Sequence, residues 1–362
     1  MTATTRAPVT GPVSRIDPAT AYRRPPSIPG ALRLDSNEGV LPSRALLGDL
    51  ANADPELLRR YPDVLALEAA LATRLGVAPE RLVVTAGADE AIDRACRAFL
   101  EPGRAILLAD PSFDMFDCSA MLAGGELVRV PWWDDAFPID AFVGRLDALT
   151  AVVAVVSPNN PTGSVATLAD VRRLATAAPD ALVMLDHVYV EYADEDLTSG
   201  VLDLPNVLVL RTLSKAWGLA GCRVGYAVGS PYVVAVLRAA GGPYTVAAPS
   251  VALALSQLQR GAGPLAAHVA RVREERRRLS ARVAAAGLVP RRSQANFLLV
   301  ECGPRAASIH AGLAARGVLV RDFPGRRGLE TALRITLPGD ASDFERLSEA
   351  LDGTLDAEGV EP

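Results

Sequence analysis

Cysteine is scarce in this sequence, and its few copies lie far apart. The 362 residues include only Cys96, Cys118, Cys222 and Cys302, and no two of them form a CxxC pair. Structural zinc sites and the disulfide frameworks of small secreted domains both need closely or regularly spaced cysteines. The spacing therefore argues against a metal site and against disulfides, and it predicts free thiols in a reducing compartment.

Long hydrophobic runs and an excess of positive charge are also missing. No stretch approaches the roughly 18–20 apolar residues of a transmembrane helix, and the first residues, MTATTRAPVTGPVSR, lack the apolar core of a signal peptide. With 37 Lys and Arg against 42 Asp and Glu, the net charge is −5. An acidic balance argues against nucleic acid and anionic membranes as partners. We expect a cytoplasmic protein that acts on small molecules.

Apolar runs alternate with amphipathic stretches through the middle of the chain. Continuous β-branched runs suit strands that are covered on both faces, and their alternation with helices indicates a mostly parallel sheet between two helical layers. The sequence therefore predicts an α/β fold with a large three-layer α/β/α domain over residues 46–245. The runs are RLVVTAG (81–87), AILLAD (105–110), AVVAVVS (151–157), LVMLDH (182–187), VLVLRT (207–212) and RVGYAVG (223–229).

The remainder of the chain has a different pattern. Residues 264–287 read as one long amphipathic helix with a basic face, and short helix and strand patterns follow it as far as LRITL (333–337) and a last helical stretch. We expect a smaller α+β domain over residues 246–362, with residues 1–45 as an N-terminal arm that packs beside it. The acidic balance of the whole chain argues against nucleic-acid binding by the basic face.

Three motifs follow the predicted strands in one order: SPNNPTG (157–163), DHVY (186–189) and TLSKAWGLAGCRVGY (212–226). Lys215 follows a buried strand, and a desolvated lysine near other cations has a lowered pKa and can form a Schiff base with an aldehyde. Asp186 ends another buried strand, where a carboxylate needs a cation such as a protonated pyridine nitrogen; a helix N-cap or a salt bridge is the alternative. An amine and an anion so placed are what pyridoxal 5'-phosphate (PLP) requires of a protein.

The same segments offer groups for the cofactor's phosphate. Arg223 can bind it in bidentate fashion, and the hydroxyls of Thr212 and Ser214 lie close to Arg223 in sequence. The segment GADE (87–90) opens a helix directly after a strand, so the backbone N–H groups of Ala88 and Asp89 would donate to an anion there. The Asp89 side chain could also be a plain N-cap, which is compatible with that backbone role.

The order and spacing of these motifs resemble the fold-type I (class I and II) aminotransferases, and among them the histidinol-phosphate aminotransferase group. The resemblance extends from SNE (36–38) to LRITLPG (333–339). It implies a PLP enzyme that moves an amino group between an amino acid such as glutamate and a keto or other carbonyl acceptor, with histidinol phosphate and imidazole-acetol phosphate as the leading substrates. It also implies catalytic roles for Lys215, Asp186 and Tyr189, with Asn160 and Tyr189 bonded to the cofactor's phenolic oxygen.

Further residues acquire roles through the resemblance alone. Phe113 would stack on the cofactor ring, and a core phenylalanine is the alternative. Tyr61 would reach the phosphate from the second subunit of a homodimer. For Arg334 and Arg321, which would bind the acidic parts of the substrate, exposed salt bridges are the alternative. The predicted substrate-binding residues are Arg334, Arg321, Asn37 and Tyr22.

Several positions depart from the family pattern. DHVY stands where relatives read DEAY, so His187 replaces a glutamate; a packed histidine is favoured over one that faces the substrate. Thr245 stands where relatives often carry asparagine, and NEGVLPS replaces an NENPxGPSP-like segment. These changes leave room for an aromatic or unusual amino acid as substrate, for a decarboxylase of the threonine-phosphate type on the same scaffold, or for a catalytically idle paralogue with a binding role.

Overall fold

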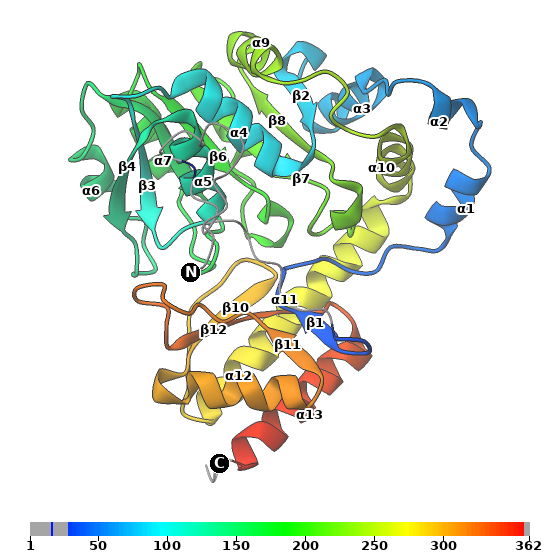
Figure 1. Ribbon diagram of the computed structural model, residues 1–362, viewed down its shortest axis with the longest axis vertical. Helices are drawn as coiled ribbons and strands as arrows, with labels where there is room; N and C mark the ends of the chain where they lie inside the picture. The colour runs from blue at the N-terminus through cyan, green and yellow to red at the C-terminus, as the bar shows by residue number, and fades with distance from the viewer. Residues whose placement is uncertain (1–15, 17–27, 358–362) are drawn as a thin grey trace, which may run out of the picture.

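A seven-stranded sheet forms the centre of the larger part of the molecule (Figure 1). The computed structural model describes residues 16 and 28–357. The strand order is β2-β8-β7-β6-β5-β3-β4, and all neighbours are parallel except at β8, which runs antiparallel to both β2 and β7. The strands are β2 (Leu82–Thr85), β3 (Ala105–Asp110), β4 (Glu126–Pro131), β5 (Thr150–Val156), β6 (Leu182–Asp186), β7 (Val207–Thr212) and β8 (Gly225–Gly229).

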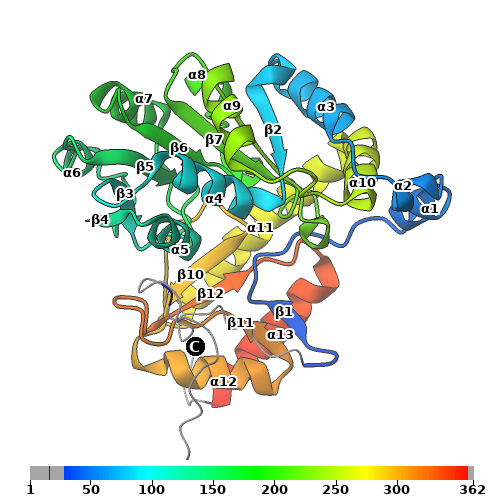
Figure 2. The same cartoon turned by 45° about the horizontal axis from the view of Figure 1, so that its top comes forward.

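Helices cover both faces of this sheet because its strands are apolar on both sides. In β5, Val152 and Ala154 pack toward α4 (Gly87–Phe99), α5 (Asp114–Ala123) and α9 (Pro231–Ala240). The alternate residues Val153 and Val155 pack toward α6 (Ile139–Val143), α7 (Leu168–Ala177) and α8 (Thr198–Val201). Figure 2 shows these two layers around the sheet. The predicted α/β/α architecture with a mostly parallel sheet is confirmed.

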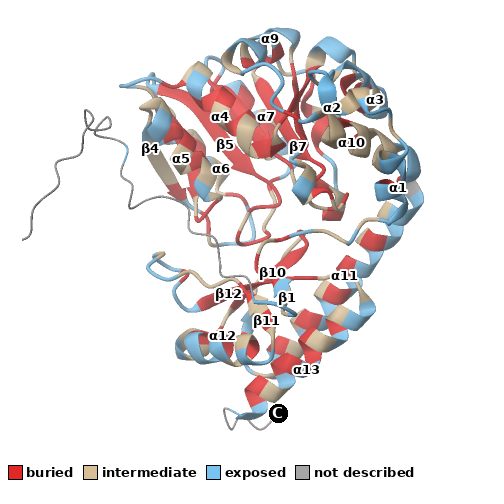
Figure 3. Cartoon of the chain, turned by 45° about the vertical axis from the view of Figure 1, so that its right-hand side comes forward, coloured by how far each residue is buried: buried red, intermediate tan, exposed pale blue. Residues whose placement is uncertain are grey.

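A smaller α+β unit lies below the large sheet, with its own buried core (Figure 3). Its antiparallel sheet has the order β12-β10-β9, and β1 pairs in parallel with β11 beside it. The N-terminal segment therefore joins this unit through β1. The elements are β1 (Leu32–Leu34), β9 (Val289–Pro290), β10 (Phe297–Glu301), β11 (Val318–Val320), β12 (Ala332–Thr336), α12 (Ala306–Ala315) and α13 (Ala341–Ala357).

Two long helices connect the units. Val251 and Ala254 of α10 (Ala248–Arg260) share a core cluster with Leu67 and Leu71 of α3 (Leu65–Leu75), so α10 packs on the large unit. The next helix, α11 (Ala262–Ala285), continues down to the small unit (Figure 1). We therefore propose to place the boundary between the domains within α11 rather than at residue 245.

The remaining helices are short. They are α1 (Ala45–Ala51), α2 (Glu56–Arg59) and the 3₁₀ turns Pro79–Arg81, Val190–Tyr192, Ala220–Cys222 and Gly303–Arg305. Within the described ranges, no helix combines the length and the apolar character needed to cross a bilayer.

Candidate active site

The three sequence motifs meet at one edge of the large sheet. They follow the carboxyl ends of β5, β6 and β7, which are parallel neighbours, and in open α/β sheets this edge is where ligands bind. The start of α4 comes to the same edge after β2, and so does the start of β8, because β8 runs in the opposite direction.

Close backbone approach shapes one corner of this edge. Gly225 lies between Thr85 of β2 and Thr212 of β7 in the sheet register. A Cβ atom on Gly225 would come within 2.4 Å of the Gly87 carbonyl carbon and 2.6 Å of the Ala88 nitrogen. Gly87 has a φ of 80°, which favours glycine. Only glycines allow the start of α4 to lie directly against β8.

Cationic and hydroxyl groups gather at this corner. Arg223 donates from Nη2 to the Asp89 carboxylate at 3.1 Å, and its guanidinium lies against Gly87. The Thr212 and Ser214 hydroxyls are 3.0 Å apart and both are buried. The arrangement brings together the side chains and the helix start that we predicted for the phosphate.

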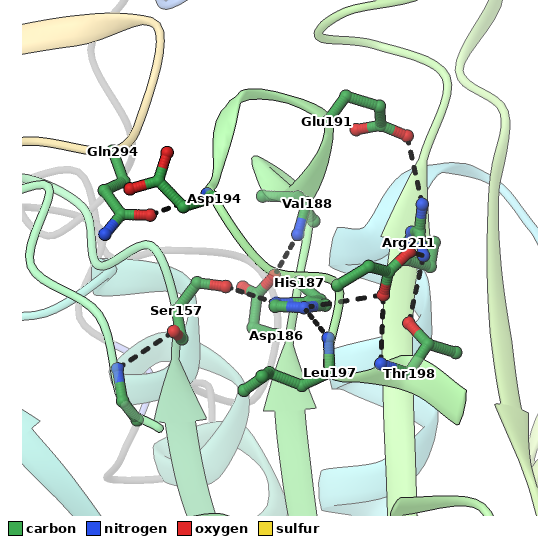
Figure 4. Close-up of polar contacts among 12 residues, drawn as sticks. Ser157, Asp186, His187, Val188, Glu191, Asp194, Leu197, Thr198, Arg211 and Gln294 are labelled. Atoms are coloured by element: carbon green, nitrogen blue, oxygen red, sulfur yellow. Dashed lines mark hydrogen bonds and ion pairs between the residues drawn. The ribbon is translucent and has the colours of Figure 1, made fainter. Parts of the chain in front are cut away.

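Asp186 is almost fully buried at the end of β6. Burial raises the pKa of its carboxyl from 3.8 to about 7; the Val188 N–H, which donates to Oδ1 at 3.3 Å, and the charge of Lys215 oppose this rise, and Asp89 adds to it (Figure 4). A carboxyl in this position is ready to pair with a cationic ligand, because such a partner would restore its ionised form.

Lys215 lies in the turn after β7, half-buried under the N-terminal segment. Its Nζ donates to the Ser36 carbonyl at 3.3 Å and lies 5.6 Å from the ring centre of Tyr189. A Cβ atom on Gly39 would collide with the Lys215 carbonyl oxygen, so the segment around residues 36–39 passes directly over this turn. The amine is thus close to Tyr189 and partly shielded from solvent.

Tyr189 is held by residues from the small unit. Its hydroxyl accepts a hydrogen bond from Asn37 Nδ2 at 3.0 Å, and Asn37 Oδ1 accepts one from the Thr336 hydroxyl at 3.0 Å. The Tyr189 ring packs edge-on against Phe297, with ring centres 5.2 Å apart. Because both ends of the Asn37 amide are engaged, Asn37 orients Tyr189 in this structure; contact with substrate stays a prediction.

Arg334 connects the two units at the site. It donates to Asn160 Oδ1 at 2.6 Å and to the Asp35 carbonyl at 2.7 Å. Because Arg334 bonds to the Asn160 oxygen, the Asn160 amide nitrogen is left to donate elsewhere. Arg321 and Arg334 face each other in an antiparallel bridge, with backbone hydrogen bonds of 3.0 and 2.8 Å, so their side chains leave the same face.

The loop between these two arginines reaches the large unit. Arg326 donates to the Ser112 carbonyl at 2.8 Å and forms an ion pair with Asp114, which places the loop beside the segment that carries Phe113. Phe113 itself is half-buried and packs against the large core. The stacking of Phe113 on a cofactor ring stays a prediction.

Tyr61 is not part of this cluster. Tyr61 stacks on Tyr244 with ring centres 4.6 Å apart, and its side chain is 79 % exposed. Tyr22 lies outside the described residues.

The two residues that depart from the family pattern have structural partners. His187 is fully buried, and burial followed by the charge of Arg211 lowers its pKa to about 4. Thr245 accepts from Arg94 and donates to Glu90. The burial of His187 agrees with the interpretation of this residue as a packed histidine.

Sequence reasoning missed a layer of supporting residues from β10 and β12. Asn296 is buried and donates to the carbonyls of Asn37 and Glu38, while Phe297 supports Tyr189. Thr336 bonds to both the backbone and the side chain of Asn37. The polar Asn296 directly before an apolar strand was the signal that could have drawn attention to it.

The chain matches the family model for aminotransferase class I and II over residues 30–351. It therefore belongs to this family, which confirms the predicted fold class and enzyme class. It is 38 % identical to a histidinol-phosphate aminotransferase of Stenotrophomonas maltophilia, covering 91 % of each chain. It is 34 % identical to an aromatic amino acid aminotransferase of Mycobacteroides abscessus, covering 91 % of this chain and 96 % of the relative.

A solved structure has the same fold. The histidinol-phosphate aminotransferase of Sinorhizobium meliloti, solved in complex with PLP, superposes with a TM-score of 0.82 at 27 % identity and covers 91 % of each chain. The present chain is a PLP-dependent aminotransferase by family. Its residues fit this cofactor, because one sheet edge offers a lysine amine, a buried carboxyl of raised pKa and a glycine-lined corner with Arg223.

Proposed function

We propose that Lys215, Asp186 and Tyr189 are the catalytic residues of this aminotransferase. The observation that carries the proposal is their convergence with the Arg334–Asn160 pair at one sheet edge. Bound PLP supplies an electron sink for the reacting carbon. Lys215 would hold the cofactor covalently, and its amine would also serve as the general base that takes the α-proton of the substrate. Asp186 would keep the cofactor's ring nitrogen protonated, and Tyr189 would donate to its phenolic oxygen.

The remaining residues of the proposed site would bind and orient the cofactor and the substrate. The backbone N–H groups of Ala88 and Asp89 would donate to the phosphate, while Asn160 Nδ2 would donate to the phenolic oxygen and Phe113 would stack on the ring. Arg334 would bind the acidic end of the substrate, a carboxylate or a phosphate, in bidentate fashion. The side chains that we assign to the phosphate are Thr212, Ser214 and Arg223.

Lysine replacement tests the core of this proposal. Borohydride reduction of the loaded native protein, followed by peptide mapping, should place the cofactor on Lys215, and Lys215→Ala should lose the attachment. With an amino donor, native protein should consume keto acid without releasing CO₂. Release of CO₂ in place of keto acid turnover would indicate a decarboxylase, and a protein that takes up no PLP would refute the cofactor assignment.

Two arginines on one face favour a substrate with a phosphate group. Arg321 and Arg334 leave the same side of their bridge, and a phosphate carries nearly two charges at neutral pH. We therefore propose histidinol phosphate and imidazole-acetol phosphate as the substrate pair. A charge-assisted hydrogen bond contributes about 1.5–3 kcal/mol, so Arg321→Ala should lower kcat/KM for a phosphate substrate about ten- to a hundredfold. It should leave a substrate without phosphate nearly unaffected.

An aromatic amino acid is the second candidate. Relatives named aromatic amino acid aminotransferase are about as similar in sequence to this chain as relatives named histidinol-phosphate aminotransferase. A screen of amino donors and keto acids decides between them: turnover of phenylalanine or tyrosine without turnover of histidinol phosphate would overturn the phosphate assignment.

We further propose a homodimer in which Tyr61 completes the site of the partner subunit. A stacked tyrosine pair that is largely exposed in the single chain is well suited to burial by a second chain. Mixing two defective variants, Lys215→Ala and Tyr61→Ser, should restore activity, because one site of the hybrid dimer then has both native residues. No restoration in verified hybrids would place Tyr61 outside a shared site.

A cytoplasmic location stays a prediction.

A further inference from the structure

A buried polar network lies behind the proposed catalytic residues and has no part in the roles assigned above. Figure 4 shows His187 from the end of β6, Arg211 from β7 and Glu191 from the segment that follows Tyr189. Asp196 of the same segment forms an ion pair with Arg211. His187 and Arg211 are almost completely buried. Burying a cation and an imidazole is costly unless each polar atom finds a partner.

The contacts of His187 define its protonation state. Its Nδ1 lies 2.5 Å from the Ser157 carbonyl oxygen, and its Nε2 lies 3.1 Å from the backbone nitrogen of Leu197. A carbonyl oxygen can only accept and a backbone N–H can only donate. His187 must therefore be neutral, with its proton on Nδ1, and the lowered pKa of its imidazole agrees with this state.

Arg211 extends the network to the lysine turn. Its Nη1 donates to Asp196 and to the Thr198 hydroxyl, both at 3.0 Å, and its Nη2 donates to Glu191 at 3.2 Å. Glu191 also accepts from the indole N–H of Trp217 at 3.3 Å. Trp217 follows Lys215 by two positions, so the network ends in the turn that carries the amine.

The network thus touches every segment that presents a catalytic side chain. Ser157 precedes Asn160 by three residues, His187 directly follows Asp186, and Glu191 follows Tyr189 by two. Successive side chains at the end of a strand point to opposite faces. Asp186 and His187 therefore point to opposite faces, so His187 anchors this backbone on the face away from the proposed ligand.

We propose that His187 is a positioning residue: its Nδ1–H bond to Ser157 sets the spacing between the Asn160 turn and the Asp186 strand end. This inference rests on the proposed function. The hydrogen bond crosses from β5 to β6 where the regular ladder ends, and its loss leaves a buried carbonyl without that donor. The Ser157 N–H also donates to the Asp186 carbonyl at 2.9 Å, so without the imidazole the spacing between the Asn160 turn and Asp186 would depend on that backbone bond alone at this point. Both Asn160 and Asp186 would contact the proposed cofactor.

Three substitutions separate positioning from simple stability. In His187→Asn, the amide nitrogen can occupy the place of Nδ1 and donate to the Ser157 carbonyl. The longer side chain of His187→Gln can at best accept from the Leu197 N–H, and His187→Ala can form neither hydrogen bond. We expect the Ala and Gln variants to bind PLP about tenfold or more weakly, as estimated from the cost of an unpaired buried acceptor. Their induced circular dichroism in the cofactor band should fall, and the Asn variant should recover most of both signals.

The chain offers a matched control in His268, another buried histidine, whose Nε2 bonds to the Tyr192 hydroxyl at 3.1 Å. His268→Ala should lower the thermal midpoint but leave PLP affinity unchanged. Native PLP affinity in His187→Ala, or equal losses in the Asn and Ala variants, would overturn the proposal.

A measurement on the native protein covers the case in which the variants do not fold. Nitrogen-15 NMR should show His187 as the neutral Nδ1–H tautomer, with a proton coupling across the bond to Ser157; a cationic ring or a proton on Nε2 would also overturn the proposal. This tautomer can be measured without cofactor. Failure of the proposed function would instead appear as a native protein that neither binds PLP nor transaminates.

Discussion

Replacing Asp186 by asparagine should make the cofactor-free protein more stable at pH 8, although it should damage the enzyme. Burial raises the pKa of this carboxyl from 3.8 to about 7. At pH 8 the native protein must therefore keep a carboxylate ionised in a site that disfavours the charge. Asparagine has nearly the same shape and carries no charge.

The size of the effect follows from the two pKa values. A pKa difference of one pH unit corresponds to about 1.4 kcal/mol, so the difference between 3.8 and about 7 corresponds to about 4 kcal/mol. Between these values the folded state binds more protons than the unfolded state, so the contribution of Asp186 to stability falls as pH rises through this window. Well below pH 3.8 the carboxyl is neutral in both states and the penalty disappears.

The assay is urea unfolding of cofactor-free protein at pH 5 and pH 8. The gain in unfolding free energy of Asp186→Asn over native protein should be larger at pH 8 and approach about 4 kcal/mol. Asp180→Asn, at an exposed position, serves as the control and should show no such gain. An Asp186→Asn variant that is equally or less stable than native protein at pH 8 would refute the reasoning. Bound PLP should reverse the order, because a cationic ring nitrogen stabilises the ionised carboxylate.

Three further changes test other parts of the site. Gly225→Ala would place a methyl group against the Gly87 and Ala88 backbone, so PLP affinity measured by equilibrium dialysis should drop while the far-ultraviolet spectrum stays native. Arg326→Ala removes the hydrogen bond and the ion pair by which Arg326 joins the loop to the large unit. We expect KM for the amino substrate to rise about fivefold with kcat nearly unchanged, consistent with an ion-pair contribution of about 1 kcal/mol. The exposed Arg292→Ala should leave KM unchanged. Phe297→Ala empties the space beneath Tyr189, and denaturation should show a loss of about 3–5 kcal/mol; a loss below 1 kcal/mol would contradict the packing.

The strands at the site were accessible from the sequence because chemistry and periodicity coincide there. Apolar runs ending in Asp186 or followed by Lys215 predict a strand and a functional group together. The antiparallel direction of β8 was not accessible, because an apolar run in a sequence does not indicate whether its strand lies parallel or antiparallel to the neighbouring strands. The packing of α10 was also not predictable, since the pattern of an amphipathic helix does not indicate which surface its apolar face covers.

The supporting layer could not be predicted for another reason. Asn37, Asn296 and Thr336 are ordinary polar residues, and only the folded chain brings them together with Tyr189. His187 was recognised as a departure from a family pattern, but its partner Ser157 lies 30 positions earlier on a different strand. Partners at such distances leave no local signal.

The contacts of Asp35 and Asn37 have a consequence for how the protein is made. Each bonds to a residue 299 positions later, Arg334 and Thr336 respectively. A ribosome must therefore synthesise nearly the whole described chain before Tyr189 acquires its orienting partners. The central sheet can form earlier from its own segments, but the contacts that join β12 to the N-terminal segment are completed last, because that segment left the ribosome at the outset.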